Sequence, residues 1–138
     1  EHVAPNIKAL VNAGIPVLGH VGLMPQSVNQ TSGYKIQGKT EKGAAQILKD
    51  AKAVEDSGAF GIVLECIPEF LATQITQKLS IPTIGIGSGN TCDGQIQVFH
   101  DIIGLAKNKP PKHARQYANL YTTILDIVKK YQIDINKS

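Results

Sequence analysis

The sequence predicts an α/β protein with a parallel sheet, because short apolar runs alternate along it with segments of helical periodicity. Residues 62–64 are Ile, Val and Leu with no polar alternation, which is typical of a strand buried on both faces of a sheet. Apolar side chains in residues 44–54 recur at steps of three and four, as on one face of a helix. Residues 14–19 and 80–85 are similar segments that both end in glycine, which indicates equivalent strands in a repeating βα architecture.

The first elements are a helix and a strand. A helix is predicted over residues 4–13, where Pro5 is tolerated in the first turn and Gly14 follows as a stop signal. A strand is predicted over residues 15–19. Residues 20–43 form a polar loop with several glycines that is too long for a plain connector. The loop could close over a functional site, or it could be an ordered surface loop.

The middle of the chain continues the alternation. We predict a helix from Ala44 to about Gly58 and a strand that ends at Glu65. Pro68 then opens a helix through residue 79, since proline is favoured in a first helical turn. Residues 81–86 form the next apolar run, which ends in glycines and predicts a third strand.

The last third of the chain has weaker signals. Residues 95–99 predict a fourth strand, and an apolar stripe predicts a long helix over about residues 113–131. Residues 132–138 are expected to be a polar, frayed tail. The whole of residues 1–138 is otherwise expected to form one half-barrel.

The chain length selects among the parallel-sheet folds. Right-handed crossovers leave a doubly wound sheet or a barrel as the main choices. A complete (β/α)8 barrel takes about 250 residues, so about four βα units in 138 residues correspond to half of a TIM-type barrel. An isolated half would expose two parallel edge strands and the inner face of the sheet. We therefore expect further sequence or obligate association.

Composition excludes several classes of function. The net charge is +3, and aromatic residues make up only 5% of the chain, which offers no stacking platform for nucleic acid. No apolar stretch reaches the roughly 18 residues of a membrane span, and the expected location is the cytoplasm. Cys66 and Cys92 are too few for a disulfide framework or a zinc site. No metal ligands are predicted in this chain.

Glu65 is the leading candidate for a catalytic residue. It is the one charged residue of the apolar run, and it lies where the strand is predicted to end. In barrels the side chains at the carboxyl ends of strands face the active site. The alternative is an acid that caps the helix opened by Pro68, since carboxylates are favourable near a helix N-terminus. The local pattern leaves both interpretations open.

His20 is the second candidate. It is expected just past the strand over residues 15–19 and between Gly19 and Gly22, so its imidazole should project toward the same mouth as Glu65. A histidine there could donate to a substrate oxygen or transfer protons, or it could be a loop residue without a role. At His100 and Asp101 the favoured interpretation is a plain helix cap by Asp101.

Glycines 85, 87 and 89 form a run that could hold an anion on bare backbone amides. The spacing does not fit a dinucleotide fingerprint, which needs its third glycine one position later and a helix directly afterwards. We favour a tight loop at the end of a strand that brings the backbone close to a ligand, over a phosphate cradle.

Four segments in consistent order resemble the ketopantoate hydroxymethyltransferase family. They are GHVGLMPQSV at 19–28, GYKIQG at 33–38, LECIP at 64–68, and the run over 81–95 that contains IPTIGIGSG and CDGQ. The resemblance covers nearly the whole chain. It implies an αβ barrel of the phosphoenolpyruvate and pyruvate superfamily, with this chain as the C-terminal half that supplies strands five to eight.

The resemblance also implies a reaction. The family carries a one-carbon unit from 5,10-methylenetetrahydrofolate to 3-methyl-2-oxobutanoate and forms 2-dehydropantoate, a step of pantothenate and coenzyme A biosynthesis. Glu65 matches the general base of the family, and His20 matches a histidine that lines the substrate pocket. The family is commonly a large homo-oligomer, and the predicted C-terminal helix is a candidate contact.

The departure from the family concerns Mg²⁺. Its ligands in the family lie on the first four strands, whose motifs this chain does not contain. We therefore expect that this chain alone binds substrate poorly and does not turn over. Two alternatives stay open. One is another Mg²⁺-dependent lyase or transferase for 2-oxo acids on the same barrel, and the other is a non-catalytic half-barrel that serves as an interaction module.

Overall fold

The structure is a computed structural model that describes residues 2–24 and 35–137. The chain divides into two compact units, Glu1–Ile96 and Gln97–Ser138. Part of the long loop predicted over residues 20–43 lies outside the described residues, so its possible closure over a site stays a prediction.

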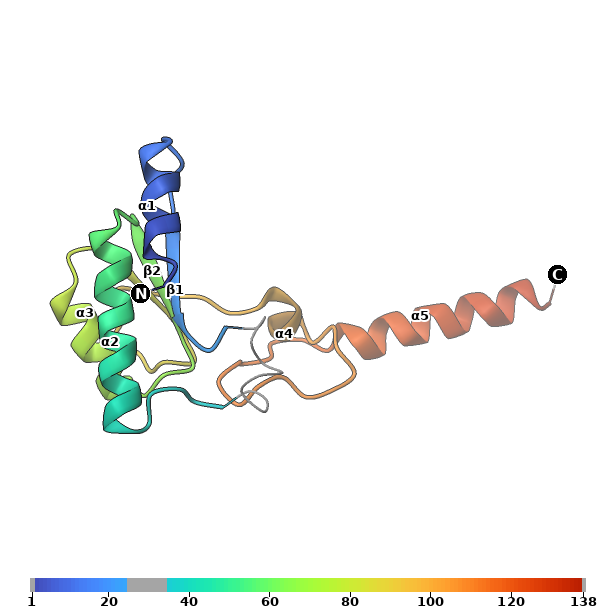
Figure 1. The fold of residues 1–138 in the computed structure, drawn as a ribbon. Coiled ribbons are helices and arrows are strands. Elements are labelled where there is room, and N and C mark those ends of the chain that lie inside the picture. The colour runs from blue at the N-terminus through green and yellow to red at the C-terminus, as the bar shows by residue number, and fades with distance from the viewer. Residues whose placement is uncertain (1, 25–34, 138) are drawn as a thin grey trace. The chain divides into compact units, whose positions relative to one another are not determined.

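The first unit is built on a four-stranded parallel sheet (Figure 1). Its strands are β1 (Leu18–Gly22), β2 (Gly61–Glu65), β3 (Thr83–Ile86) and β4 (Gly94–Gln95), and they lie side by side in chain order. Every pairing is parallel. Parallel neighbours need a crossover connection, and helices supply two of the three. The predicted α/β class with parallel strands is confirmed.

Three helices accompany this sheet: α1 (Ala4–Asn12), α2 (Glu41–Asp56) and α3 (Glu69–Lys78). The hydroxyl of Thr40 caps α2 by accepting a 3.1 Å hydrogen bond from the backbone N–H of Gly43. Pro68 is the N-cap of α3, which agrees with the predicted helix start. Helices α2 and α3 lie against the sheet (Figure 1).

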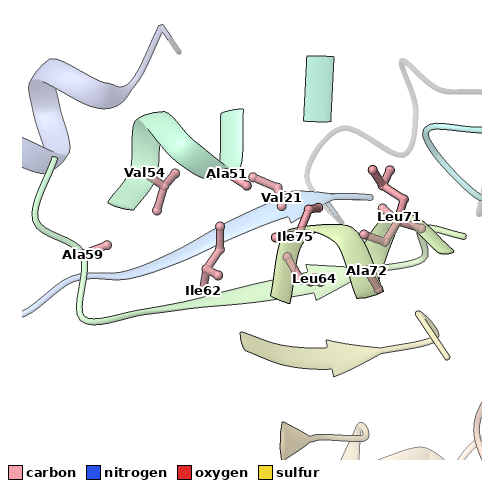
Figure 2. Packing of buried hydrophobic residues seen from close by; sticks show 10 residues of the cluster. Val21, Ala51, Val54, Ala59, Ile62, Leu64, Leu71, Ala72 and Ile75 are labelled. Atoms are coloured by element: carbon pink, nitrogen blue, oxygen red, sulfur yellow. The ribbon is translucent and has the colours of Figure 1, made fainter. Parts of the chain in front are cut away.

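The hydrophobic core fills the layer between the sheet and these helices (Figure 2). From the sheet come Val21, Ile62 and Leu64, and they meet Ala51 and Ile75 of the two helices. Because side chains alternate between the faces of a strand, this packing fixes which residues of β1 and β2 point away from the helices. The remaining core members are Val54, Ala59, Ile67, Leu71 and Ala72.

Strand β1 begins later than the sequence predicted. The apolar pattern indicated residues 15–19, whereas pairing with β2 runs from Leu18 to Gly22. Pro16 has no backbone N–H to give to a ladder, and regular pairing begins where Gly61 of β2 lies opposite Leu18. His20 is therefore inside β1, and the expectation that it follows the strand is wrong.

The second unit contains α4 (Phe99–Ile103) and α5 (Leu120–Ile135). The fourth strand predicted over residues 95–99 is only the two-residue β4, because the chain turns into α4 at Phe99. Val98 is the N-cap of α4 and Asp101 lies within the helix, so the predicted cap by Asp101 is wrong.

Helix α5 begins at Leu120 rather than near residue 113, and it continues four residues past Tyr131 to Ile135. The side chain of Asn119 caps it by accepting from the backbone N–H of Thr122, 3.2 Å away. Residues 132–135, which we expected in a polar tail, are thus helical. None of the residues of α5 is buried.

Candidate active site

The sheet register brings the two predicted site residues onto one face. His20 lies opposite Val63, and Gly22 lies opposite Glu65. Since Val21 and Leu64 point into the helix-facing core, the alternation of side chains places His20 and Glu65 together on the other face. Glu65 is the last residue of β2, at the carboxyl edge of the sheet where ligands bind in α/β folds.

The two side chains are in contact. Nε2 of His20 lies 3.0 Å from Oε2 of Glu65, and the Glu65 side chain is only 13% exposed. The same nitrogen is buried and has no hydrogen bond to any described residue. The contact is therefore a close polar approach at a hydrogen-bond distance, without a hydrogen bond formed. This contact with His20 does not indicate that Glu65 caps a helix.

The backbone around Glu65 is held on both sides. Its carbonyl accepts a 2.9 Å hydrogen bond from the N–H of Leu23, just past β1. The N–H of Cys66 donates to the carbonyl of Ile86 at 2.9 Å, and the carbonyl of Cys66 accepts from Gln37 at 2.8 Å. These bonds tie the end of β2 to segments from three other parts of the chain.

Cys66 carries local strain. Its φ is +50°, and among the described residues it is the one non-glycine residue with a positive φ. A side chain in this region costs of order 1–3 kcal/mol and persists only where the surroundings impose it, which is common beside functional sites. Burial raises the pKa of the Cys66 thiol, and the charge of Glu65 raises it further.

Ser88 supplies a buried polar link that sequence reasoning missed. Its hydroxyl is fully buried and donates a 2.7 Å hydrogen bond to the carbonyl of Leu64, the residue before Glu65. The same oxygen accepts from the N–H of Ile67 at 3.4 Å. A serine within a glycine run after a strand was the only available signal, since Leu64 and Ile67 lie more than 20 residues away in the chain.

The glycine run forms a tight loop, and one of its backbone amides binds a carboxylate of the protein itself. The N–H of Asn90 donates to Oε1 of Glu69 at 3.0 Å, so a carboxylate of α3 satisfies an amide that a phosphate would otherwise need. The amide of Gln95 closes the loop by donating to the carbonyl of Gly89 at 3.1 Å. This geometry agrees with the strand-end loop that the spacing favoured over a phosphate cradle.

A polar cluster anchors the other side of that loop. Oδ2 of Asp93 accepts from both the N–H and the hydroxyl of Thr83, at 2.8 and 2.9 Å. These hydrogen bonds hold the pKa of Asp93 below its usual value, with the backbone N–H of Thr83 as the main cause. The Thr83 hydroxyl also lies 2.8 Å from that of Thr76 in α3. Asp93, directly before β4, is thus a structural acid that binds the first residue of β3.

A cavity of about 270 Å³ lies along β1. His20, Gly22 and Met24 line it together with Ile47 and Asp50 of α2, whereas Glu65 is not in its lining.

Within residues 2–24 and 35–137, no group of three or more His, Cys, Asp or Glu side chains could hold a metal ion. In the same residues, no helix is both long and apolar enough to cross a membrane.

A parallel sheet with crossover helices and an acid at its carboxyl edge is the arrangement of half of an α/β barrel protein. A family model described as ketopantoate hydroxymethyltransferase matches residues 1–138. The chain belongs to this family.

Curated relatives support the same family, and each is named 3-methyl-2-oxobutanoate hydroxymethyltransferase. The Carboxydothermus hydrogenoformans protein is 50% identical over 135 residues, which are 98% of this chain and 49% of that protein. The Clostridium botulinum protein is 54% identical over 129 residues, or 94% and 47%. The Dehalococcoides mccartyi protein is 52% identical over 136 residues, or 99% and 49%. The chain thus spans about half the length of these relatives, as the half-barrel prediction requires.

Proposed function

We propose that the complete protein, of which this chain forms about half, transfers a hydroxymethyl group from 5,10-methylenetetrahydrofolate to 3-methyl-2-oxobutanoate to give 2-dehydropantoate. Support comes from the family match over residues 1–138 and from relatives about 50% identical whose names state this activity with this 2-oxo acid. The reaction belongs to pantothenate biosynthesis. Folate is the proposed cosubstrate.

The observation that carries the proposal is the position of Glu65. Its carboxylate is mostly buried at the carboxyl end of β2 and lies within contact distance of His20. A 2-oxo acid becomes a carbon nucleophile when a base removes the proton next to its carbonyl. Glu65 takes that proton as general base: the C–H bond breaks, an O–H bond forms on the carboxylate, and the C–H electron pair becomes the enolate. His20 lines the substrate pocket.

Mg²⁺ belongs to the proposal as a cofactor held elsewhere in the complete protein. The described residues do not fit a metal, because they contain no group of three or more candidate ligands. The proposed ligands lie in the half that the relatives have in addition to the matched region.

The proposal also covers the activity of this chain alone, the assembly of the complete protein and its location. This chain alone is inactive, because the enolate charge needs a cation that the described residues do not hold. The complete protein is a homo-oligomer, and exposed apolar side chains of α5, including Ile127 and Tyr131, are candidates for the contact. Its location is the cytoplasm, where small-molecule biosynthesis takes place.

Glu65→Gln in the complete enzyme tests the base role. The variant and the wild type are incubated with 3-methyl-2-oxobutanoate in D₂O, and deuterium uptake beside the carbonyl is followed by NMR. Loss of exchange with retained binding of the keto acid supports the proposal, and undiminished exchange overturns it. Glu41→Gln, an exposed acid in the first turn of α2, is the matched control and keeps the wild-type rate.

A further inference from the structure

Hydrogen bonds hold the backbone at Glu65, whereas its carboxylate has one ion-pair contact among the described residues, with His20. The backbone groups on both sides of its Cα are hydrogen-bonded, to Leu23 on one strand and to Ile86 on another. In the described part of the chain, no lysine or arginine pairs with the carboxylate, whose one ion-pair contact is with His20. The sheet therefore fixes the position of the Glu65 Cα. The position of the carboxylate group depends on its contact with His20.

The imidazole is itself incompletely satisfied. Nε2 of His20 is buried and lacks a hydrogen bond within the described residues, although it lies 3.0 Å from Oε2 of Glu65. A buried polar nitrogen without a partner costs about 1–3 kcal/mol, so the pair gains free energy when the N–H turns onto the oxygen. Catalytic hydrogen bonds are often poorly aligned without substrate and tighten when it binds.

We propose that His20 is a positioning residue for the Glu65 carboxylate. Its Nε2–H holds Oε2, which leaves Oε1 to take the proton from the substrate carbon. This role places a hydrogen on Nε2 of His20 and gives the base a fixed direction. The inference rests on the proposed function, because it needs Glu65 to be the base, and it goes further in that His20 acts through Glu65 rather than only on the keto acid.

The groups around the pair leave this role to His20. On the same face of the sheet, Val63 lies opposite His20 and Ile86 lies opposite Glu65, and both side chains are apolar. Apolar neighbours strengthen a hydrogen bond between polar groups, since they lower the local dielectric constant. Gly22, opposite Glu65 in the register, adds no side chain that could replace the imidazole.

Two substitutions of His20 in the complete enzyme test the inference. His20→Leu removes the donor, and His20→Gln keeps a side-chain N–H. Because small misplacement of a reacting group costs up to about 100-fold in rate, His20→Leu is expected to lower kcat and the deuterium exchange rate by about 10-fold to 100-fold with little change in KM. His20→Gln is expected to recover most of the lost kcat. His113→Leu, at an exposed histidine, is the control.

The outcomes separate the two proposals. If His20→Leu mainly raises KM and leaves kcat intact, His20 only binds substrate and the positioning role is wrong. Unchanged kcat and KM overturn it as well, as does a fall in kcat that His20→Gln does not relieve. These results leave the base role standing, because that role is judged only by exchange in Glu65→Gln. Circular dichroism of each variant confirms that the comparison is made between folded proteins.

Discussion

Oε1 of Glu69 accepts a 3.0 Å hydrogen bond from the backbone N–H of Asn90, and the Glu69 side chain covers Gly89. The first residue of α3 therefore holds the loop that follows β3. Gly89 has φ +79°, and a Cβ built there would overlap the Cβ, Cγ and Cδ atoms of Glu69. Two separate constraints, conformation and space, thus require glycine at this position.

Gly89→Ala is expected to lower the free energy of unfolding by about 2–4 kcal/mol, since left-handed strain and overpacking each cost about 1–2 kcal/mol. Gly14→Ala is the matched control: its φ is +81°, but nothing lies within 4 Å of the added Cβ. Denaturant unfolding of the complete protein measures both. Equal losses in the two variants would mean that the Glu69 side chain moves away from the added Cβ without a loss of stability.

The sequence predicted the elements whose signal is local. The apolar run before Glu65 ends β2 at the expected residue, and the helical periodicity of residues 44–54 falls within α2. The start of β1 was shifted, because residues 15–19 are apolar enough for a strand but pairing depends on where β2 lies. Apolar pattern predicts the type of an element better than its first hydrogen bond.

The sequence singled out two side chains of the candidate site, whose roles stay a prediction, but not the contacts around them. Glu65 and His20 were singled out, and the structure brings them within 3.0 Å. The link from Ser88 to Leu64 joins residues 24 apart in sequence, and the link from Asn90 to Glu69 joins residues 21 apart. Such contacts depend on how separate segments pack, and a single sequence without a structure carries no signal for them.

Asp93→Asn is expected to lower the free energy of unfolding at neutral pH. In acid this difference from the wild type is expected to disappear. The pKa of Asp93 is lowered below its usual 3.8, so its contribution is present above that value and disappears as pH falls through the lower value of the folded state. Asp93 is exposed, so the loss at pH 7 should be only about 0.5–1 kcal/mol.

Urea unfolding at several pH values measures this difference. Asp126→Asn, at an exposed acid of α5, is the control and should change stability little at any pH. A gap between Asp93→Asn and wild type that stays constant down to pH 2 would contradict the assigned hydrogen bonds of the Asp93 carboxylate.

Ile75→Ala is expected to destabilise the first unit strongly. Ile75 is completely buried between α3 and the sheet, and deletion of such a side chain leaves a cavity (Figure 2). The expected loss is about 2–5 kcal/mol. Phe70→Ala, on the same helix but 57% exposed, should cost about 0.5–1 kcal/mol despite the larger side chain. Thermal or denaturant unfolding compares them, and a larger loss at Phe70 would show that this surface is covered in the complete protein.

Cys66 is expected to resist alkylation at pH 8. Burial, and secondarily the charge of Glu65, raises the pKa of its thiol above the usual 9.0, so little of the reactive thiolate is present. Iodoacetamide labelling followed by peptide mass spectrometry separates Cys66 from Cys92, and an unstructured cysteine peptide gives the reference rate. Glu65→Gln should accelerate labelling only modestly, because burial is the larger cause.

The same shift makes stability fall in alkali. Above pH 9 the unfolded chain ionises the Cys66 thiol before the folded protein does, so the free energy of unfolding decreases until the pH passes the higher pKa of the folded state. Cys66→Ala removes this part of the pH dependence. Labelling of Cys66 at the rate of the reference peptide, or an alkaline stability profile that Cys66→Ala leaves unchanged, would place the thiol in water and contradict its burial.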